Sequence, residues 1–300
     1  MHAVLAFPNI GPEIFAIDFG FFRFGLRWYA MAYIVGIILG WRMAVFLVRR
    51  ERLWQGRAPL TSSQVDDYVT WIIIGIIAGG RIGYVLFYKP LDFLARPWEI
   101  PMIWQGGMAF HGGAIGVALA IYFFAKRQDA PLANVADMTA MCIPPGIFLG
   151  RLANFINAEL WGLPSTVPWA VVFPTVAAQD CPGVEGACAR HPSQLYEAGL
   201  EGLLLGLVMF WLIYARGWLK TPWAITGVFL AGYGASRFLV EFYRQADAQY
   251  ITPENPLGYV IELGFVGLKM GQLLSLPMIV GGIALLALAR RQREVQRDSA

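Results

Sequence analysis

The residues with the most chemistry to offer lie inside apolar stretches of this sequence, and the densest group is the segment 150–162, GRLANFINAELWG. Arg151 and Asn154 are three residues apart and share one face of a helix, while Asn157 lies about one turn further on and Glu159 follows. A capped helix end with a surface ion pair is the alternative interpretation, but it does not require so many polar groups. A charged side chain costs about 2.5–3.5 kcal/mol in the centre of a bilayer, so we interpret this group as a candidate site.

A second polar stripe lies in the segment 232–249, GYGASRFLVEFYRQADAQ. Tyr233, Arg237 and Glu241 are spaced four residues apart and therefore share one side of a helix. Arg237 and Glu241 could form an internal ion pair that only stabilises a buried charge. We favour a site, in which Glu241 orients Arg237 and the planar guanidinium binds a phosphate.

Three further ionisable residues fall in or near apolar runs. His111, in GGMAFHGGAIG, is either a hydrogen-bonded structural residue or a base, and the glycines on both sides leave room for a ligand or a neighbouring backbone. For Arg81 the sequence leaves two interpretations open, a structural ion pair and a role in the site. Arg42 lies about one turn from the end of its run and can extend its charge into the interface.

The segment RHPSQLYEAGLE starts another apolar run. His191 precedes a predicted helix start with Ser193 as its cap, so we interpret this histidine as structural. Tyr196, Glu197 and Glu201 add polar groups to the same helix.

These residues must be positioned by membrane helices, because the composition is that of a membrane protein. Hydrophobic residues make up 57% of the 300 residues and charged residues 14%, against about 25% charged residues in soluble domains. Apolar runs long enough to cross a bilayer recur about seven times. We therefore predict an all-α, polytopic bundle with helices near 28–48, 68–87, 109–125, 135–156, 195–214, 223–242 and 273–289.

The distribution of lysine and arginine predicts how the chain is oriented. Twelve of these residues fall in one set of connections and seven in the opposite set; the first set is 49, 50, 52, 57, 126, 127, 216, 220, 290, 291, 293 and 297. Because basic loops stay in the cytoplasm, we expect the N-terminus outside and the C-terminus in the cytoplasm. Residues 1–300 then form a single integral membrane domain, with an external cap at about 158–192 and a cytoplasmic tail at about 290–300.

Composition also limits the partners. A formal charge of +3 without a basic patch argues against nucleic acid, and the three histidines and three cysteines show no metal-ligand spacing, so we expect no metal and no cofactor. Cys181 and Cys188 lie in the predicted external loop, where an oxidising compartment would make a disulfide plausible; the sequence leaves this open.

Several segments together resemble the prolipoprotein diacylglyceryl transferase family. The matching segments run nearly end to end: 26–36, 79–88, 106–116, 150–162, 190–198, 232–249 and 270–279. Small departures occur where the family often has other residues, at Gln105, Ala109, Ala153, Ala158 and Ala246. The loop 163–189 resembles the family least.

The resemblance implies an enzyme of the bacterial inner membrane that starts lipoprotein maturation. It would transfer the diacylglyceryl group of phosphatidylglycerol to the lipobox cysteine thiol of preprolipoprotein signal peptides, forming a thioether and releasing glycerol phosphate. Membrane lipids would be its other partners. The alternative is a transporter or binding protein for an anionic lipid or solute, but such proteins often contain an internal repeat, and this sequence shows none.

On that resemblance, Arg151 and Arg237 would grip the phosphate, and His111 is the first candidate for the base that activates the thiol. The other expected site residues bind the head group or position the arginines: Tyr29, Asn154, Asn157, Glu159, Gly162, Tyr233 and Glu241.

Overall fold

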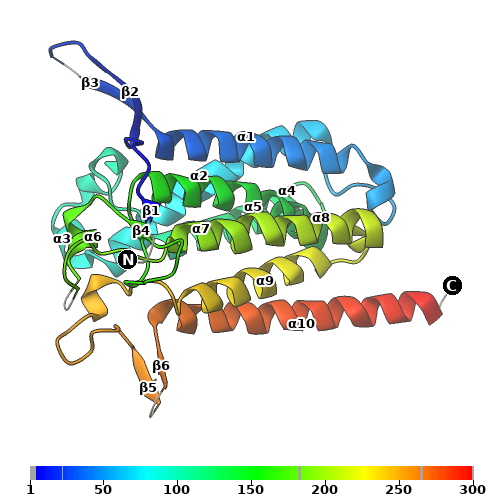
Figure 1. Cartoon of the computed structure of the whole chain (residues 1–300). Coiled ribbons are helices and arrows are strands. Elements are labelled where there is room, and N and C mark those ends of the chain that lie inside the picture. Colours follow the sequence, from blue (N-terminus) through cyan, green and yellow to red (C-terminus); the bar gives the residue numbers. More distant parts are fainter. Residues whose placement is uncertain (1–4, 22, 182–183, 264–265, 299–300) are drawn as a thin grey trace. The chain divides into compact units, whose positions relative to one another are not determined.

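Long helices dominate the computed structural model, which describes residues 5–21, 23–181, 184–263 and 266–298 (Figure 1). The long helices are α1 (Trp28–Val48), α2 (Ser62–Phe87), α4 (Phe110–Arg127), α5 (Leu132–Ile156), α9 (Ala224–Val240) and α10 (Met270–Asp298). A further long helix consists of α7 (Ser193–Glu197), the π-helical stretch η4 (Ala198–Leu204) and α8 (Leu205–Arg216). Two short helices, α3 (Pro90–Ala95) and α6 (Val176–Gln179), lie in the connections.

Helices occur at all seven places where the apolar runs predict them. Within the described residues, five are long and apolar enough to cross a membrane: Trp28–Val48, Ser62–Phe87, Leu132–Ile156, Ser193–Arg216 and Met270–Val295. Helix α9 has 17 residues, and α4 has 18 residues but ends in Lys126 and Arg127. The chain is thus a mostly helical, multi-pass membrane protein, while the count of seven crossings and the orientation remain predictions.

The chain divides into two compact units, one formed by Met1–Gly40 with Ala140–Ala300 and the other by Trp41–Thr139. In the second unit, α2 and α4 approach so closely that their glycines leave no room for side chains. A Cβ atom on Gly83 would lie 2.7 Å from the Cα of Gly112, and one on Gly75 would lie 2.6 Å from the carbonyl oxygen of Gly116. Small residues at intervals of four allow such contacts between membrane helices. Gly112, beside His111, therefore makes room for a neighbouring backbone.

In the first unit, α9 and α10 lie side by side (Figure 1). Gly234 of α9 meets the backbone of Ser275, and Gly227 meets that of Gly282, so glycines again set the helix separation. These contacts pack the middle of α9 against α10.

The predicted external cap contains a small core of its own. Strand β1 (Leu5–Ala6) pairs in parallel with β4 (Val171–Val172), and the buried Phe173 packs with Phe7 and Phe155. Cys181 and Cys188 are joined by a disulfide bond. Among the described residues, β2 (Glu13–Asp18) pairs antiparallel with β3 (Arg23–Arg27), and β5 (Ile261–Leu263) pairs antiparallel with β6 (Val266–Leu268).

Candidate functional site

One buried carboxylate connects the two arginines that the sequence singles out. Oε1 of Glu197 accepts a hydrogen bond of 2.5 Å from Arg237, and its Oε2 lies 3.2 Å from Nε of Arg151. The Glu197 side chain is fully buried, whereas those of Arg151 and Arg237 are 21% and 16% exposed. The accessible side of the cluster is therefore guanidinium, with the balancing carboxylate behind it.

Two more carboxylates hold the same arginines. Glu201, in the π-helical stretch, lies 3.5 Å from Arg151, and Glu241 lies 2.6 Å from Arg237 at the predicted spacing of four residues. Tyr233, one turn before Arg237, interacts electrostatically with both arginines. A widened turn such as η4 often marks a functional site in a helix.

A buried lysine supports the C-terminal end of α9. Nζ of Lys269 donates to the backbone carbonyls of Glu241 (3.0 Å) and Arg244 (2.6 Å), where the last turn of the helix has carbonyls without helical partners. Burial lowers the pKa of Lys269, and the nearby Arg244 and Arg237 act in the same direction, against Glu241. Gly271 leaves space for the Glu241 carboxylate, because a Cβ atom there would lie 2.5 Å from Oε2.

The asparagines meet in the turn that follows α5. Nδ2 of Asn154 donates to Oε1 of Glu159 at 2.7 Å, and Nδ2 of Asn157 approaches the same oxygen at 3.4 Å. Glu159 thus contacts the asparagines. The carboxylates that pair with the arginines are Glu197 in α7, Glu201 in η4 and Glu241 at the end of α9. Ala158 and Leu160 adopt left-handed backbone conformations with φ of 52° and 56°. Gln194 and Ser193 stabilise this turn by donating to the carbonyls of Glu159 and Leu160.

Tyr29 and Gly162 also belong to this first unit. The Tyr29 hydroxyl accepts a hydrogen bond from Tyr33 at 3.3 Å, and the Tyr33 hydroxyl interacts electrostatically with Arg151 and Glu159. Gly162 is buried where three backbone segments meet: a Cβ atom there would contact the Tyr243 carbonyl and lie 2.7 Å from Cβ of His191.

His111 and Arg81 lie in the second unit. His111 is exposed in the first turn of α4, with its ring against Phe110, and its role as a base stays a prediction. Arg81 is buried and donates to the carbonyls of Ile100, Glu99, Gly106 and Gly107. Backbone carbonyls therefore partner this arginine, which favours a structural role.

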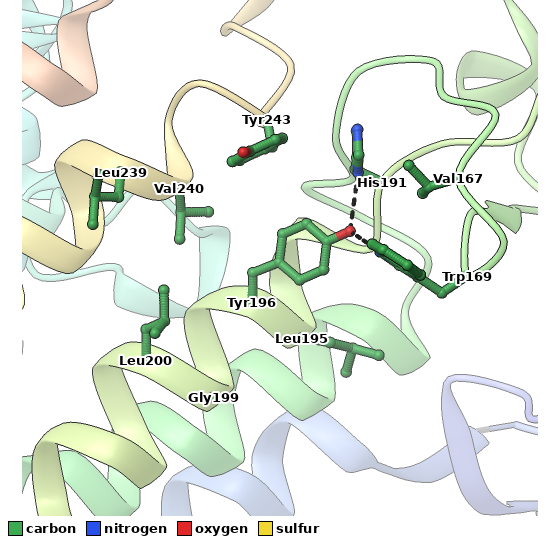
Figure 2. Close-up of a pocket in the computed structure, with 10 residues that line it drawn as sticks. All are labelled: Val167, Trp169, His191, Leu195, Tyr196, Gly199, Leu200, Leu239, Val240 and Tyr243. Atoms are coloured by element: carbon green, nitrogen blue, oxygen red, sulfur yellow. Dashed lines mark hydrogen bonds between the residues drawn. The ribbon is translucent and has the colours of Figure 1, made fainter.

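A cavity of about 580 Å³ is lined by the helix that begins with α7, by the end of α9 and by the cap (Figure 2). Its walls are mostly apolar, and its polar groups gather at one end, where Tyr196 bonds to both Trp169 and His191. Burial lowers the pKa of His191. The lining residues are Val167, Trp169, His191, Leu195, Tyr196, Gly199, Leu200, Leu239, Val240 and Tyr243. An amphiphilic ligand requires such a combination of apolar walls and a few convergent polar groups.

Some buried polar atoms have no hydrogen-bond partner among the described residues. They include Asn157 Oδ1 and Gln194 Oε1 near Glu159 and Glu201 Oε1 beside Arg151, and others lie elsewhere, such as Thr175 Oγ1 and Gln292 Oε1. The described residues contain no group of histidine, cysteine and carboxylate side chains suited to a metal ion.

Comparison with known proteins decides the family. The family model for prolipoprotein diacylglyceryl transferase matches residues 16–288. The chain belongs to the prolipoprotein diacylglyceryl transferase family. The phosphatidylglycerol–prolipoprotein diacylglyceryl transferase of Ruegeria pomeroyi is 58% identical to it over 291 residues, which are 97% of this chain and 99% of the relative. The enzymes of the same name from Cereibacter sphaeroides (strain ATCC 17025) and Rhizobium meliloti are 55% and 48% identical, over 96% of this chain and 98% and 95% of the relatives.

The predicted membership of the prolipoprotein diacylglyceryl transferase family is thus confirmed. Sequence reasoning identified Arg151, Arg237 and Glu241 but did not assign Glu197 and Glu201 as the partners of the arginines. Their spacing of four residues in an otherwise apolar helix was the available signal, because it places two carboxylates on one buried face.

Proposed function

We propose that this chain transfers the diacylglyceryl group of phosphatidylglycerol to the thiol of the lipobox cysteine in a preprolipoprotein. In this reaction the sulfur forms a bond to the glyceryl carbon that carries the phosphate ester, and the bond between that carbon and the ester oxygen breaks. The electron pair leaves with glycerol phosphate, and the thiol proton goes to a base. Membership of the family supports this assignment.

The observation that carries the site assignment is the bridge that Glu197 makes between Arg151 and Arg237. One rigid carboxylate sets the separation of two guanidinium groups, whose accessible faces are positive. Charge develops on the phosphate as the carbon–oxygen bond breaks, and preorganised cations aimed at that charge lower the barrier. Arg151 and Arg237 would hold the phosphate in this way, with Glu201, Tyr233 and Glu241 positioning them.

The segment 154–162, which we call the asparagine turn, would bind the uncharged part of the head group. Asn154 and Asn157 share Glu159 as an acceptor, and amide groups held in this way offer both donors and acceptors to glycerol hydroxyls. Tyr29 would contribute a hydroxyl, and Gly162 would shape the turn. His111 remains the candidate base, because the thiolate is the reactive form of cysteine and the free thiol has a pKa of about 8.5.

We place the enzyme in the bacterial inner membrane as one integral membrane domain, with residues 158–192 outside and 290–300 in the cytoplasm. The disulfide between Cys181 and Cys188 supports this orientation, because disulfides persist in oxidising compartments.

The test is incubation of the purified protein with labelled phosphatidylglycerol and a lipobox peptide, followed by mass spectrometry of the peptide. The expected result is a mass gain of one diacylglyceryl group on the cysteine, and none on a peptide with serine at that position. If the mass gain were also absent with active membranes, the transporter alternative would be favoured. A transporter would move labelled lipid or anion across vesicles and leave the peptide unmodified.

Arg237→Lys examines the phosphate contact in the same assay. Lysine keeps the charge but presents a single point donor instead of a planar fork, so turnover should fall by about 10²-fold. Near-normal transfer by this variant would remove Arg237 from the phosphate site.

A further inference from the structure

Arg190 is a buried guanidinium that the proposed mechanism does not use. It is 2% exposed, and its Cζ lies 4.0 Å from the ring centre of Trp161. Among the described residues no carboxylate forms an ion pair with it. Its acceptors are the carbonyls of Ala178 (2.6 Å), Asp180 (2.9 Å) and Gly162 (3.2 Å) and the side chain of Gln245 (3.2 Å).

These acceptors come from three separate segments of the first unit. Ala178 and Asp180 lead into the disulfide loop, Gly162 ends the asparagine turn, and Gln245 follows the C-terminal end of α9. Two of these segments carry site residues, since Gly162 lies three residues after Glu159 and Gln245 lies four after Glu241. One side chain therefore joins both parts of the candidate site to the external cap.

The asparagine turn depends on such support. Its two left-handed residues, Ala158 and Leu160, have side chains that disfavour this conformation. Backbone bonds hold the far end of the turn, because Gly162 donates to the carbonyl of His191 (2.8 Å) and Leu163 to that of Tyr243 (2.8 Å). Arg190 adds the bond to the Gly162 carbonyl, which faces the cap.

The cap end of the contact is held by the disulfide between Cys181 and Cys188. The Gln179 side chain reinforces the loop by donating to the carbonyls of Phe173 and Cys188 and accepting from the Cys188 amide. The carbonyls that bind Arg190 therefore belong to a segment with a fixed shape.

We propose that Arg190 is a positioning residue for diacylglyceryl transfer, which aligns Glu159, Asn154 and the end of α9 against the arginines and depends on the Cys181–Cys188 disulfide for its own placement. This inference rests on the proposed function. A lysine could not replace Arg190, because one ammonium group cannot reach acceptors on three segments at once.

The experiment measures kcat and KM for phosphatidylglycerol with a lipobox peptide, per folded molecule, in the full-length enzyme. The variants are Arg190→Lys, the double variant Cys181→Ser/Cys188→Ser, and all three substitutions together. Arg96→Lys is the matched control, because Arg96 is an exposed arginine paired only with Glu99 in the salt bridges of the described residues. The unfolding temperature of each variant is measured in parallel and must lie well above the assay temperature.

Arg190→Lys should lower kcat by about tenfold or more while KM changes by less than about threefold, since small misplacements of positioned groups cost turnover. Removal of the disulfide should lower kcat in the same direction, and its effect should vanish in the Arg190→Lys background. A protein that only lost stability would keep its kcat per folded molecule. Unchanged kcat, a rise in KM alone, or losses that multiply independently would each overturn the proposal.

A milder variant covers the case in which Arg190→Lys does not fold. Gln245→Ala removes one partly exposed acceptor, and a fall of about threefold in kcat is expected, whereas an unchanged kcat would contradict the proposal. Wild-type enzyme serves as the reference for the proposed function. If the wild type transfers the diacylglyceryl group and the variants do so equally well, only the positioning role of Arg190 is overturned. If the wild type shows no transfer, the proposed function and the positioning role are both overturned.

Discussion

Glu197 places a single carboxylate between the guanidinium groups of Arg151 and Arg237, so it sets the position of both arginines of the proposed phosphate site. Glu197→Gln keeps the shape of the side chain but removes its charge. We expect turnover to fall by more than about tenfold, because each arginine then keeps only its second carboxylate, Glu201 or Glu241, and the link between the two arginines is lost. Stability should also fall, because breaking a buried ion pair costs about 3–5 kcal/mol. The measurements are kcat per folded molecule and the unfolding temperature in detergent.

Glu294→Gln is the control for this prediction, since Glu294 forms an exposed pair with Arg290 that contributes little. If Glu197→Gln retained normal turnover, the bridge would be irrelevant to the reaction.

His191 makes a second prediction, about pH. Burial lowers the pKa of His191 below its usual 6.5, so the folded protein keeps the ring neutral while the unfolded chain takes up a proton. Stability should therefore be full above pH 6.5, fall as the pH drops below that value, and level off below the folded pKa. The unfolding temperature should decrease as the pH falls below about 6.5, and this decrease should be smaller in His191→Asn. If the unfolding temperatures of wild type and His191→Asn depended equally on pH, this prediction would be wrong.

At this scale the sequence predicts residues better than their partners. Arg151, Arg237 and Glu241 stand out because charge is costly in apolar helices. Glu197 binds Arg237 across 40 residues of chain, and no local spacing reveals such a contact. Arg190 precedes a helix at the edge of a loop, where a charged residue draws no attention until its burial is known.

At the scale of elements, the first turn of α10 is shaped to accept Glu241. Gly271→Ala would place a Cβ atom 2.5 Å from Glu241 Oε2, and this carboxylate also pairs with Arg237. We expect Glu241 to shift, turnover to fall by about tenfold, and stability to decrease by about 1–3 kcal/mol through overpacking. Kinetics and thermal unfolding measure the two effects.

Gly281→Ala in the same helix is the matched control. A Cβ atom there meets nothing within 4 Å, and alanine is favoured over glycine in helices by about 0.5–1 kcal/mol. Equal behaviour of the two variants would show that the space at Gly271 does not matter.

Helix positions follow well from apolar runs, and helix ends do not. The run predicted at 28–48 coincides with α1. Helix α2 begins six residues before its predicted start of 68, because Thr61 and Gln64 form a capping box and Asp66 bonds to Trp41. Because the first turn of α2 is polar, hydropathy does not predict where the helix begins, although the capping box is a local sequence signal.

For the whole molecule, the composition is sufficient to identify a membrane protein, but hydropathy and length alone disagree on the number of crossings. Seven runs are predicted, and five helices of the described residues meet the criteria of length and apolarity. The shortfall concerns α4 and α9, which are shorter or carry charge at their ends. The two counts place the disulfide loop on opposite sides of the membrane.

The disulfide and the basic residues together favour seven crossings. With the connection 49–61 in the cytoplasm, seven crossings put residues 158–192 outside, where Cys181 and Cys188 can stay oxidised, whereas five would put them inside. The variant Thr166→Cys, in a Cys142→Ser background, should therefore react with a membrane-impermeant maleimide in intact cells. The variant Ser63→Cys in the same background should react only after the membrane is permeabilised. Protection of the Thr166→Cys variant in intact cells would establish the five-crossing arrangement and would separate the cap from the outer face where the proposed substrates meet.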